Sequence, residues 1–232
     1  MTKVFLATPA FSGKVNVSYA IALAETFALL ASRGIETHIC IHSSGSLLVA
    51  ERNRLNKAFL ATDCTHMLCI DSDLAWPAMS VPAMLDYDVD FVAGCYPARG
   101  ENIFLFRPVY LPNGAVETNS KNLLKMNFIP AGFMLIKRAV IEKLHEQFSH
   151  EYFQPKDPSQ ADEDGFCIFN TEVRDGEFWG EDFTFCRKVR ECGFDIWVDP
   201  LIEFDHNGTR GQMAACLTND PEKARMSDQV PK

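Results

Sequence analysis

Two carboxylates separated by one residue, Asp71 and Asp73, directly follow a short apolar run at Met67–Ile70. An apolar run of this length bounded by polar residues is typical of a buried β-strand. Open α/β sheets bind ligands at the carboxyl ends of their strands, so Asp71, Ser72 and Asp73 are expected at a ligand-binding edge. Carboxylate oxygens are hard ligands that suit Mg²⁺ or Mn²⁺. The motif therefore predicts a divalent-metal site.

A pattern as short as D-x-D also arises without any function, and this chain holds a second acidic cluster at Asp86, Asp88 and Asp90. That cluster precedes a predicted strand, where acidic residues commonly form turns and caps. Only Asp71 and Asp73 follow a predicted buried strand. The strand context therefore favours this pair as the metal site.

A further acidic pair, Glu181 and Asp182, stands in the first turn of a helix predicted from Gly180 to Cys192. Acidic residues there stabilise a helix through its dipole by about 0.3–1 kcal/mol. A carboxylate held at a cleft can instead serve as a general base. Position alone favours the stabilising role, and the catalytic role stays open.

His206 and Arg52 are two more candidates whose types suit a nucleotide site. His206 lies after a late predicted strand, and an imidazole beside carboxylates would favour Mn²⁺ over Mg²⁺. A lone histidine is more often structural or solvated. Arg52 lies in a predicted helix, either on an exposed face or near a diphosphate or base, because its guanidinium suits planar, bidentate recognition.

The ends of two other predicted strands complete the candidate site. Thr8, Pro9 and Ala10 end the first strand and could line a bound nucleotide. Several residues in the second half could contact an acceptor sugar, although most aromatic residues simply belong to the core. These are Tyr96, Arg99, Phe104, Phe178 and Trp179.

The elements that must position these residues alternate regularly over the first part of the chain. They are a strand at Lys3–Thr8, a helix at Val17–Ala31, a strand at Ile35–Ile41, a helix at Leu47–Ala61 and a strand at Met67–Ile70. The second helix is expected to be capped from a turn at residues 43–46. Such alternation implies right-handed crossovers and predicts an α/β fold whose central sheet is mostly parallel and flanked by helices.

The rest of the chain is less regular but shows no linker and no internal repeat, so one domain over residues 1–232 is expected. A helix should open at Trp76-Pro77, a mobile loop should cover residues 150–165, and the polar residues after Asn207 should wrap or fray. The other predicted elements are strands at 90–94, 124–129, 133–137, 194–198 and 201–204, a hairpin at 109–116 and a helix at 139–148.

Composition excludes several classes of function. The formal net charge is −9 and no Lys/Arg cluster is present, which argues against a nucleic-acid binder. No apolar run approaches the roughly 20 residues of a membrane span, and the N-terminal residues resemble a first strand more than a signal peptide. The eight cysteines form no C-x-x-C pair, which predicts free thiols in a reducing, cytoplasmic location.

Three common enzyme fingerprints are also missing from the sequence. There is no G-x-x-x-x-G-K-[ST] and no G-x-G-x-x-G, which argues against P-loop and dinucleotide-binding sites. There is no G-x-S-x-G, which argues against an α/β hydrolase.

The order of these motifs resembles that of GT-A-fold glycosyltransferases, and most of all the small family 2-like enzymes of bacteria and viruses. The resemblance runs from about Lys3 to Asn207 and includes the Thr-Pro strand end, the Arg-Asn of the second helix, the D-x-D, the Gly-Glu-Asp helix start and the late histidine. It implies a nucleotide-sugar-binding half at about 1–95, an acceptor and catalytic half at about 96–207, and a tail at 208–232. One departure is Glu51, where many relatives have a small residue.

The resemblance also implies roles for individual residues. Asp71, Asp73 and His206 would hold Mn²⁺ or Mg²⁺, with Asp73 the direct carboxylate ligand. Asp182, assisted by Glu181, would be the catalytic base of an inverting enzyme, and Arg52 would reach the nucleotide.

These expectations together predict a metal-dependent transfer of a sugar from a UDP- or GDP-linked donor to a hydroxyl acceptor, a glycan. A metal neutralises charge on the leaving diphosphate, while a carboxylate takes the acceptor proton. The alternatives are a sugar-phosphate nucleotidyltransferase and a binding module without turnover. The single Gly and Lys at Gly13 and Lys14 argue against the first, because such enzymes usually carry a Gly-rich basic loop there. The donor's sugar and base, the stereochemical course and the oligomeric state are left open.

Overall fold

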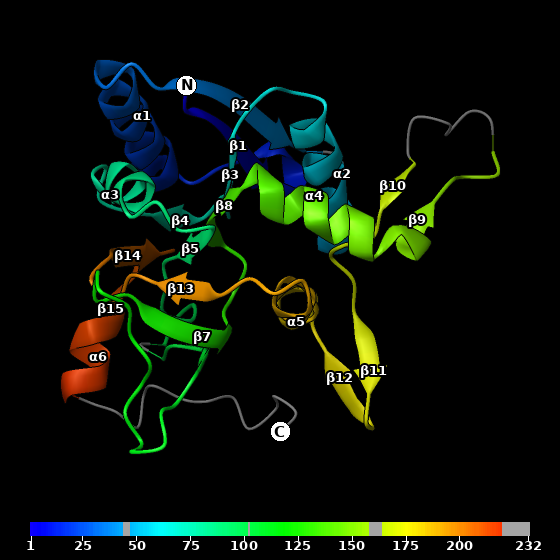
Figure 1. The fold of residues 1–232 in the computed structure, drawn as a ribbon. Coiled ribbons are helices and arrows are strands. Elements are labelled where there is room, and N and C mark those ends of the chain that lie inside the picture. The colour runs from blue at the N-terminus through cyan, green and yellow to red at the C-terminus, as the bar shows by residue number, and fades with distance from the viewer. Residues whose placement is uncertain (44–46, 102, 158–163, 220–232) are drawn as a thin grey trace.

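The computed structural model describes residues 1–43, 47–101, 103–157 and 164–219 (Figure 1). Its centre is a sheet whose strands lie in the order β2-β1-β3-β8-β5-β13-β7-β6. The bounds of these strands are β1 Lys3–Pro9, β2 Glu36–His42, β3 His66–Ile70, β5 Phe91–Ala93, β6 Arg107–Pro108, β7 Leu124–Phe128, β8 Phe133–Lys137 and β13 Ile196–Val198.

The sheet is mixed, but most of its strands point the same way. β1 pairs in parallel with β2 and β3, and β13 pairs in parallel with β5. Only β8 and β7 run against their neighbours. The predicted α/β class, with a largely parallel central sheet flanked by helices, is therefore confirmed.

Helices cover both faces of the sheet (Figure 1). Their bounds are α1 Val17–Ser32, α2 Leu48–Leu60, α3 Ser80–Asp86, α4 Arg138–Gln147, α5 Glu181–Glu191 and α6 Met213–Asn219, with short 3-10 turns η1 Phe11–Gly13 and η2 Ser149–Glu151. Residues of α1 and α3 share one hydrophobic cluster, and residues of α2, α4 and α5 share the other.

The alternation of side chains along β1 explains this two-sided core. Val4 and Leu6 pack into the cluster with α1 and α3, whereas Phe5 and Ala7 pack into the cluster with α2, α4 and α5. Successive side chains of a strand point to opposite faces. A strand buried on both faces therefore has a continuous apolar sequence, as seen here.

Three small sheets lie outside the central one. β9 Tyr152–Phe153 pairs with β10 Gly165–Phe166, and β11 Glu172–Arg174 pairs with β12 Glu177–Trp179. β14 Glu203–His206 lies between β4 Leu74–Ala75 and β15 Thr209–Gln212. This last sheet ties the segment after Asp73 to the end of the described chain.

Several predicted elements differ in the structure. The helix expected at Trp76-Pro77 begins at Ser80, because Leu74 and Ala75 extend to pair with β14. Regular structure continues past Asn207 as β15 and α6, because β15 pairs with β14 and Met213 is buried in the core. Tertiary pairing overrides the weak local pattern in both places.

Three further expectations are only partly met. The hairpin at 109–116 contains one antiparallel bridge, Tyr110–Val116, and a turn closed by the Leu111–Ala115 hydrogen bond of 2.8 Å, rather than two full strands. The N-cap of α2 is Leu47, and most of the expected capping turn, residues 44–46, lies outside the described residues. The expected loop at 150–165 contains η2 and β9 in its described part, while 158–163 lie outside it.

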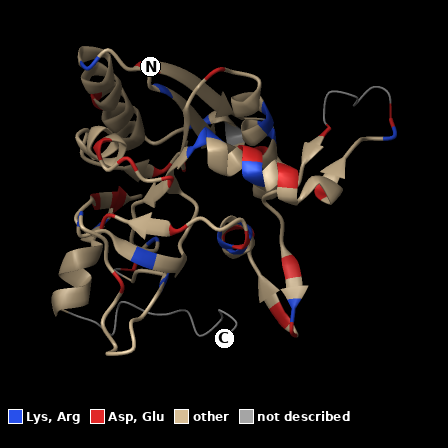
Figure 2. Cartoon of the chain, viewed as in Figure 1, with Lys and Arg blue, Asp and Glu red and all other residues tan. Residues whose placement is uncertain are grey.

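Three further observations complete the fold. All eight cysteines are free thiols, as predicted. Across the described helices, none combines the length and apolar character needed to cross a membrane. Lys and Arg are interspersed with Asp and Glu along the described elements (Figure 2).

Candidate active site

A cavity of about 260 Å³ lies at the carboxyl ends of β1 and β3. This is the edge at which open α/β sheets bind ligands. Five of the predicted site residues line it together: Pro9, Ala10, Asp71, Ser72 and Asp73. The rest of the lining comes from Phe11, Leu48, Glu51 and Arg99.

The end of β1 forms one wall of this cavity. Thr8 itself is fully buried, and its hydroxyl is hydrogen-bonded to the Tyr19 hydroxyl at 2.6 Å, which ties α1 to the strand. The Ala10 N–H donates to the His42 carbonyl at 2.8 Å. Thr8 therefore supports the wall from behind, while Pro9 and Ala10 face the cavity.

Three backbone hydrogen bonds join the turn after β3 to distant segments. The N–H of Asp71 donates to the Gly132 carbonyl at 2.9 Å, and the N–H of Asn16 donates to the Ser72 carbonyl at 2.9 Å. The N–H of Asn207 donates to the Asp73 carbonyl at 3.2 Å. Segments from three parts of the chain thus hold the backbone that carries both carboxylates.

Asp73 faces His206, which the pairing of β4 with β14 brings alongside. The Nε2 atom of His206 lies 3.3 Å from Oδ2 of Asp73, and its Nδ1 is hydrogen-bonded to the Pro97 carbonyl at 2.7 Å. This second bond fixes the ring so that Nε2 points to the carboxylate. The guanidinium of Arg99 forms an ion pair with Asp73 and donates to His206 Nε2 at 3.2 Å.

The electrostatics favour the charged form of Asp73. Burial raises the pKa of this carboxyl. The neighbouring His206 and Arg99 lower it by more, so the net pKa lies below its ordinary value. An ionised carboxylate beside an imidazole nitrogen is a donor pair that suits Mn²⁺ better than Mg²⁺.

The spacing of this pair fits a divalent metal. Oδ2 of Asp73 is buried, and its neighbours are the ion-paired guanidinium of Arg99 and Nε2 of His206. Its 3.3 Å separation from His206 Nε2 is close to the roughly 3 Å between adjacent ligands of an octahedral ion with bonds of about 2.1 Å. Asp73 and His206 could therefore hold a metal if the Arg99 side chain moved aside.

Asp71 is turned in a different direction, toward Arg52. Its Oδ1 accepts a hydrogen bond from Arg52 Nη2 at 2.9 Å, and Nε of Arg52 lies 3.7 Å from Glu181 Oε1. Only 4% of the Arg52 side chain is exposed, so the exposed-face interpretation of this residue is excluded. Burial alone would lower the pKa of Arg52, but the two carboxylates outweigh it and raise that pKa.

Gly132 allows Asp71 to approach the neighbouring strand. A Cβ atom at this position would lie 2.5 Å from Oδ2 of Asp71 and 2.3 Å from the Tyr96 hydroxyl. The Gly132 N–H also donates to that hydroxyl at 3.0 Å. Only glycine fits this close contact.

Asp182 has the electrostatics of a general base. Burial, followed by the negative charge of Glu181, raises the pKa of its carboxyl to about 6, although the Phe183 N–H donates to it at 2.8 Å. A catalytic carboxylate works best when its pKa is near the working pH. Gly180, the N-cap of α5, places both acidic residues in the first turn of the helix.

The structure does not bring every predicted metal ligand together. Asp71, Asp73 and His206 do not form a three-ligand group in the described chain, since Asp71 is bound to Arg52. The one such group found there is His38, Asp63 and Cys64, at the far end of the sheet's first strands.

The sequence did not predict that two further residues, Glu51 and Arg99, would line the cavity. Glu51, noted only as a departure from the family pattern, is 2% exposed, lines the cavity and binds His42 and Arg54. Arg99, considered only as an acceptor contact, forms an ion pair with Asp73. Of the other residues considered for an acceptor, Phe104 is fully buried and Phe178 is exposed. No short-range signal distinguishes these positions.

Comparison with known proteins gives no family assignment. No family model matches this chain, and no curated protein matches it. A glycosyltransferase involved in the glycosylation of the major capsid of PBCV-1 is similar at 10% identity over 61% of this chain and 63% of that chain, with a TM-score of 0.36.

Two other solved structures show similar values. S. aureus TarS 1–349 in complex with UDP-GlcNAc has 12% identity over 86% of this chain and 56% of that chain, with a TM-score of 0.44. A nucleoside-diphosphate-sugar pyrophosphorylase from Vibrio cholerae RC9 has 12% identity over 84% of this chain and 90% of that chain, with a TM-score of 0.42. The chain spans less than two thirds of the length of the first two structures.

Proposed function

We propose that this protein is a metal-dependent glycosyltransferase that moves a sugar from a UDP- or GDP-linked donor to a hydroxyl of a glycan acceptor. The observation that carries the proposal is the facing pair of Asp73 and His206 beside the cavity at the end of β3. A nucleoside diphosphate entering this cavity would meet the carboxylates of Glu51, Asp71 and Asp73. Neutralisation by a divalent cation would make such binding favourable.

In this proposal, different residues bind the metal, bind the donor and accept the proton. Asp73 and His206 would hold Mn²⁺ or Mg²⁺, which as a Lewis acid stabilises negative charge on the leaving diphosphate. Pro9, Ala10 and Ser72 form the cavity walls against which the donor would bind. Asp182 would accept the proton of the attacking hydroxyl, because its raised pKa makes it a stronger base than an ordinary carboxylate.

Arg52 has a positioning role in this proposal. It bridges Asp71 and Glu181, so the turn after β3 and the start of α5 are held together by one buried guanidinium. In this way the metal-binding turn and the proposed base keep a fixed separation.

The test is hydrolysis or transfer of UDP- and GDP-linked sugars, measured with Mn²⁺, with EDTA and in Asp73→Ala. Activity should require the cation and fall to background with EDTA and in the variant. Asp195→Ala, which removes a half-exposed carboxylate beside Lys125, should retain activity and serves as the matched control. Undiminished turnover both with EDTA and in Asp73→Ala would refute the metal-dependent mechanism.

The nucleotidyltransferase alternative predicts a different product. Such an enzyme would release pyrophosphate when a nucleoside triphosphate and a sugar 1-phosphate are mixed. Gly13 and Lys14 are both exposed, and together they are the only glycine and lysine of the loop after β1. Release of pyrophosphate without sugar transfer would replace our proposal with this one.

A further inference from the structure

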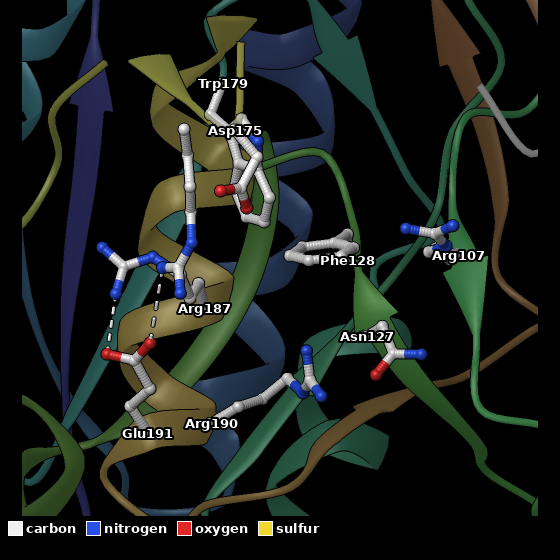
Figure 3. A pocket seen from close by; sticks show the side chains of 9 residues that line it. Arg107, Asn127, Phe128, Asp175, Trp179, Arg187, Arg190 and Glu191 are labelled. Carbon is white, nitrogen blue, oxygen red and sulfur yellow. Dashed lines mark hydrogen bonds and ion pairs between the residues drawn. The ribbon is translucent and has the colours of Figure 1, made fainter. Parts of the chain in front are cut away.

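A second cavity, of about 520 Å³, lies between α5, the strands β6 and β7, and the β11–β12 hairpin (Figure 3). Its size falls within the range of small-ligand pockets. It shares no lining residue with the first cavity. The lining residues are Arg107, Asn127, Phe128, Arg174, Asp175, Trp179, Arg187, Arg190 and Glu191.

The charge of this cavity is opposite to that of the chain. Four arginines and two acidic residues line it, which gives 4 − 2 = +2, whereas the whole chain carries −9. In Figure 3, Arg187 and Glu191 lie on one side of the Phe128 ring and Arg107 lies on the other. A concave site with excess arginine attracts anions and binds carboxylates or phosphates with a planar fork of donors.

The arginines differ in how far the protein already neutralises them. Arg187 is bound to Glu172 at 3.0 Å and to Glu191 at 2.7 Å, and Arg174 lies 3.8 Å from Glu191. Arg190 forms no ion pair within the described chain, and its guanidinium lies 5.7 Å from the centre of the Phe128 ring. Its place in the last turn of α5 also suits the helix dipole, but leaves the guanidinium available to a ligand.

Trp179 supplies an independent sign of a ligand. The residue is only 7% exposed, and among the described residues its Nε1–H has no hydrogen-bond partner. A buried indole N–H is usually satisfied, so this donor lacks an acceptor that a bound molecule could provide. Its ring packs edge-on against Phe128 at 5.4 Å, which holds it in the cavity wall.

The cavity lies beside the proposed catalytic carboxylates. Trp179 is followed in the chain by Gly180, Glu181 and Asp182, so the tryptophan and the proposed base share one short connection between β12 and α5. Phe128 contacts both Trp179 and Phe183, the residue after Asp182. The cavity and the proposed base therefore share the β12–α5 connection and the ring of Phe128.

We propose that this second cavity binds an anionic saccharide, and that the acceptor is a glycan carrying carboxylate or phosphate groups. Arg190 would pair with the anionic group, and the indole N–H of Trp179 would donate to an oxygen of the sugar. The role as an acceptor site rests on the proposed function, whereas the binding of an anionic saccharide can be tested without it.

The test is equilibrium binding of four probes to the full chain by calorimetry. The probes are a galacturonic acid trisaccharide, a phosphorylated maltotriose, neutral maltotriose and inorganic phosphate. At least one charged saccharide should bind, with an affinity that falls as salt increases, because salt screens charges at exposed sites. Maltotriose should bind much more weakly, and the two charged arms tell carboxylate from phosphate recognition.

Two variants and one control locate the binding. Arg190→Gln should weaken the charged saccharide at least about tenfold. Trp179→Phe keeps a ring against Phe128 but removes the N–H, so it should weaken the same probe and abolish any ligand-induced change in fluorescence from this tryptophan. The control is Arg33→Gln, which removes a partly exposed arginine that is bound to Asp86 of α3, outside the cavity. This variant should bind the charged saccharide like wild type.

Several results would overturn the inference. These are equal binding of charged and neutral trisaccharides, binding of inorganic phosphate as tight as that of the charged saccharide, or wild-type affinity in both cavity variants. Donor hydrolysis measured in parallel separates the two proposals. If no donor is turned over but Arg190-dependent binding is observed, the proposed function fails and the anionic saccharide site stands.

Discussion

Replacing Asp182 with Asn should make the protein more stable and much less active at neutral pH. In the folded state, burial and the nearby Glu181 raise the pKa of Asp182 to about 6, from an ordinary 3.8. At 1.36 kcal/mol per pKa unit, this difference corresponds to up to about 3 kcal/mol of destabilisation above pH 6. Asn is uncharged and can still accept the hydrogen bond from the Phe183 N–H.

The pH dependence has a definite sign. Between about pH 4 and pH 6 the folded state keeps the Asp182 proton that the unfolded state has lost, because the folded-state pKa is raised. Stability falls with increasing pH wherever the folded state binds more protons. Wild type should therefore lose stability from pH 4 to pH 6 relative to Asp182→Asn, and the difference should be constant above that window.

Urea unfolding of both proteins from pH 4 to pH 8 measures this difference. Asp195→Asn, a half-exposed carboxylate beside Lys125, should give no comparable gain in stability. The charged and titratable groups that face Asp182 are Glu181, Arg52, Tyr96 and Cys186, and they are unchanged in the comparison. An Asn variant that is less stable than wild type at pH 8 would refute the electrostatic reasoning.

Activity gives the second readout of the same variant. Loss of a general base typically lowers the rate by about 10²–10⁴-fold. Wild-type turnover should also decline as pH falls through about 6, because Asp182 becomes protonated. A more stable variant with unchanged turnover would show that the buried Asp182 carboxylate destabilises the folded state but does not act as the base.

Three other predictions concern the residues around Asp71 and Asp73. Gly132→Ala should destabilise the protein by about 1–3 kcal/mol and reduce metal-dependent turnover, because its Cβ would lie 2.5 Å from Asp71 Oδ2; Gly165→Ala, whose nearest contact is 3.8 Å, is the control in thermal unfolding, and equal effects would contradict this account. Arg52→Gln should cost about 3–5 kcal/mol in urea unfolding, because Asp71 and Glu181 lose their buried partner; Arg52→Lys should cost less, and a neutral Gln variant would exclude the bridging role. His206→Ala should weaken Mn²⁺ binding measured by calorimetry without donor present, and unchanged affinity would remove His206 from the site.

Local sequence patterns predicted much of the first half of the fold. Regular strand–helix alternation from Lys3 to Ile70 located β1, α1, β2, α2 and β3 to within a few residues. β1 and β3 are continuous apolar runs that the structure buries, so local pattern and tertiary burial agree there. In α2 most of the buried residues are polar, and its place followed from the alternation of elements rather than from an apolar face. The β11–β12 hairpin was missed because its residues are mostly exposed and show no such pattern.

Local sequence patterns predicted only part of the candidate site. Sequence alone marked Asp71, Asp73, Asp182 and His206 by residue type and by position next to an element boundary. It did not show that Arg52 would be buried between two carboxylates, since an arginine next to Glu51 in a polar helix looks exposed.

The chemical groups, and most of the strands and helices that carry them, can be predicted from the sequence, because hydrophobic patterns act over a few residues. Which of these groups meet depends on tertiary packing. The pairing of β4 with β14 brings His206 to Asp73, and Gly132 leaves room for the Asp71 carboxylate, which binds Arg52. Likewise, the arginines of the second cavity come from β6, β11 and α5, and no pattern within one element can show that they face a common space. These are contacts between distant segments, which depend on how the sheet and helices pack.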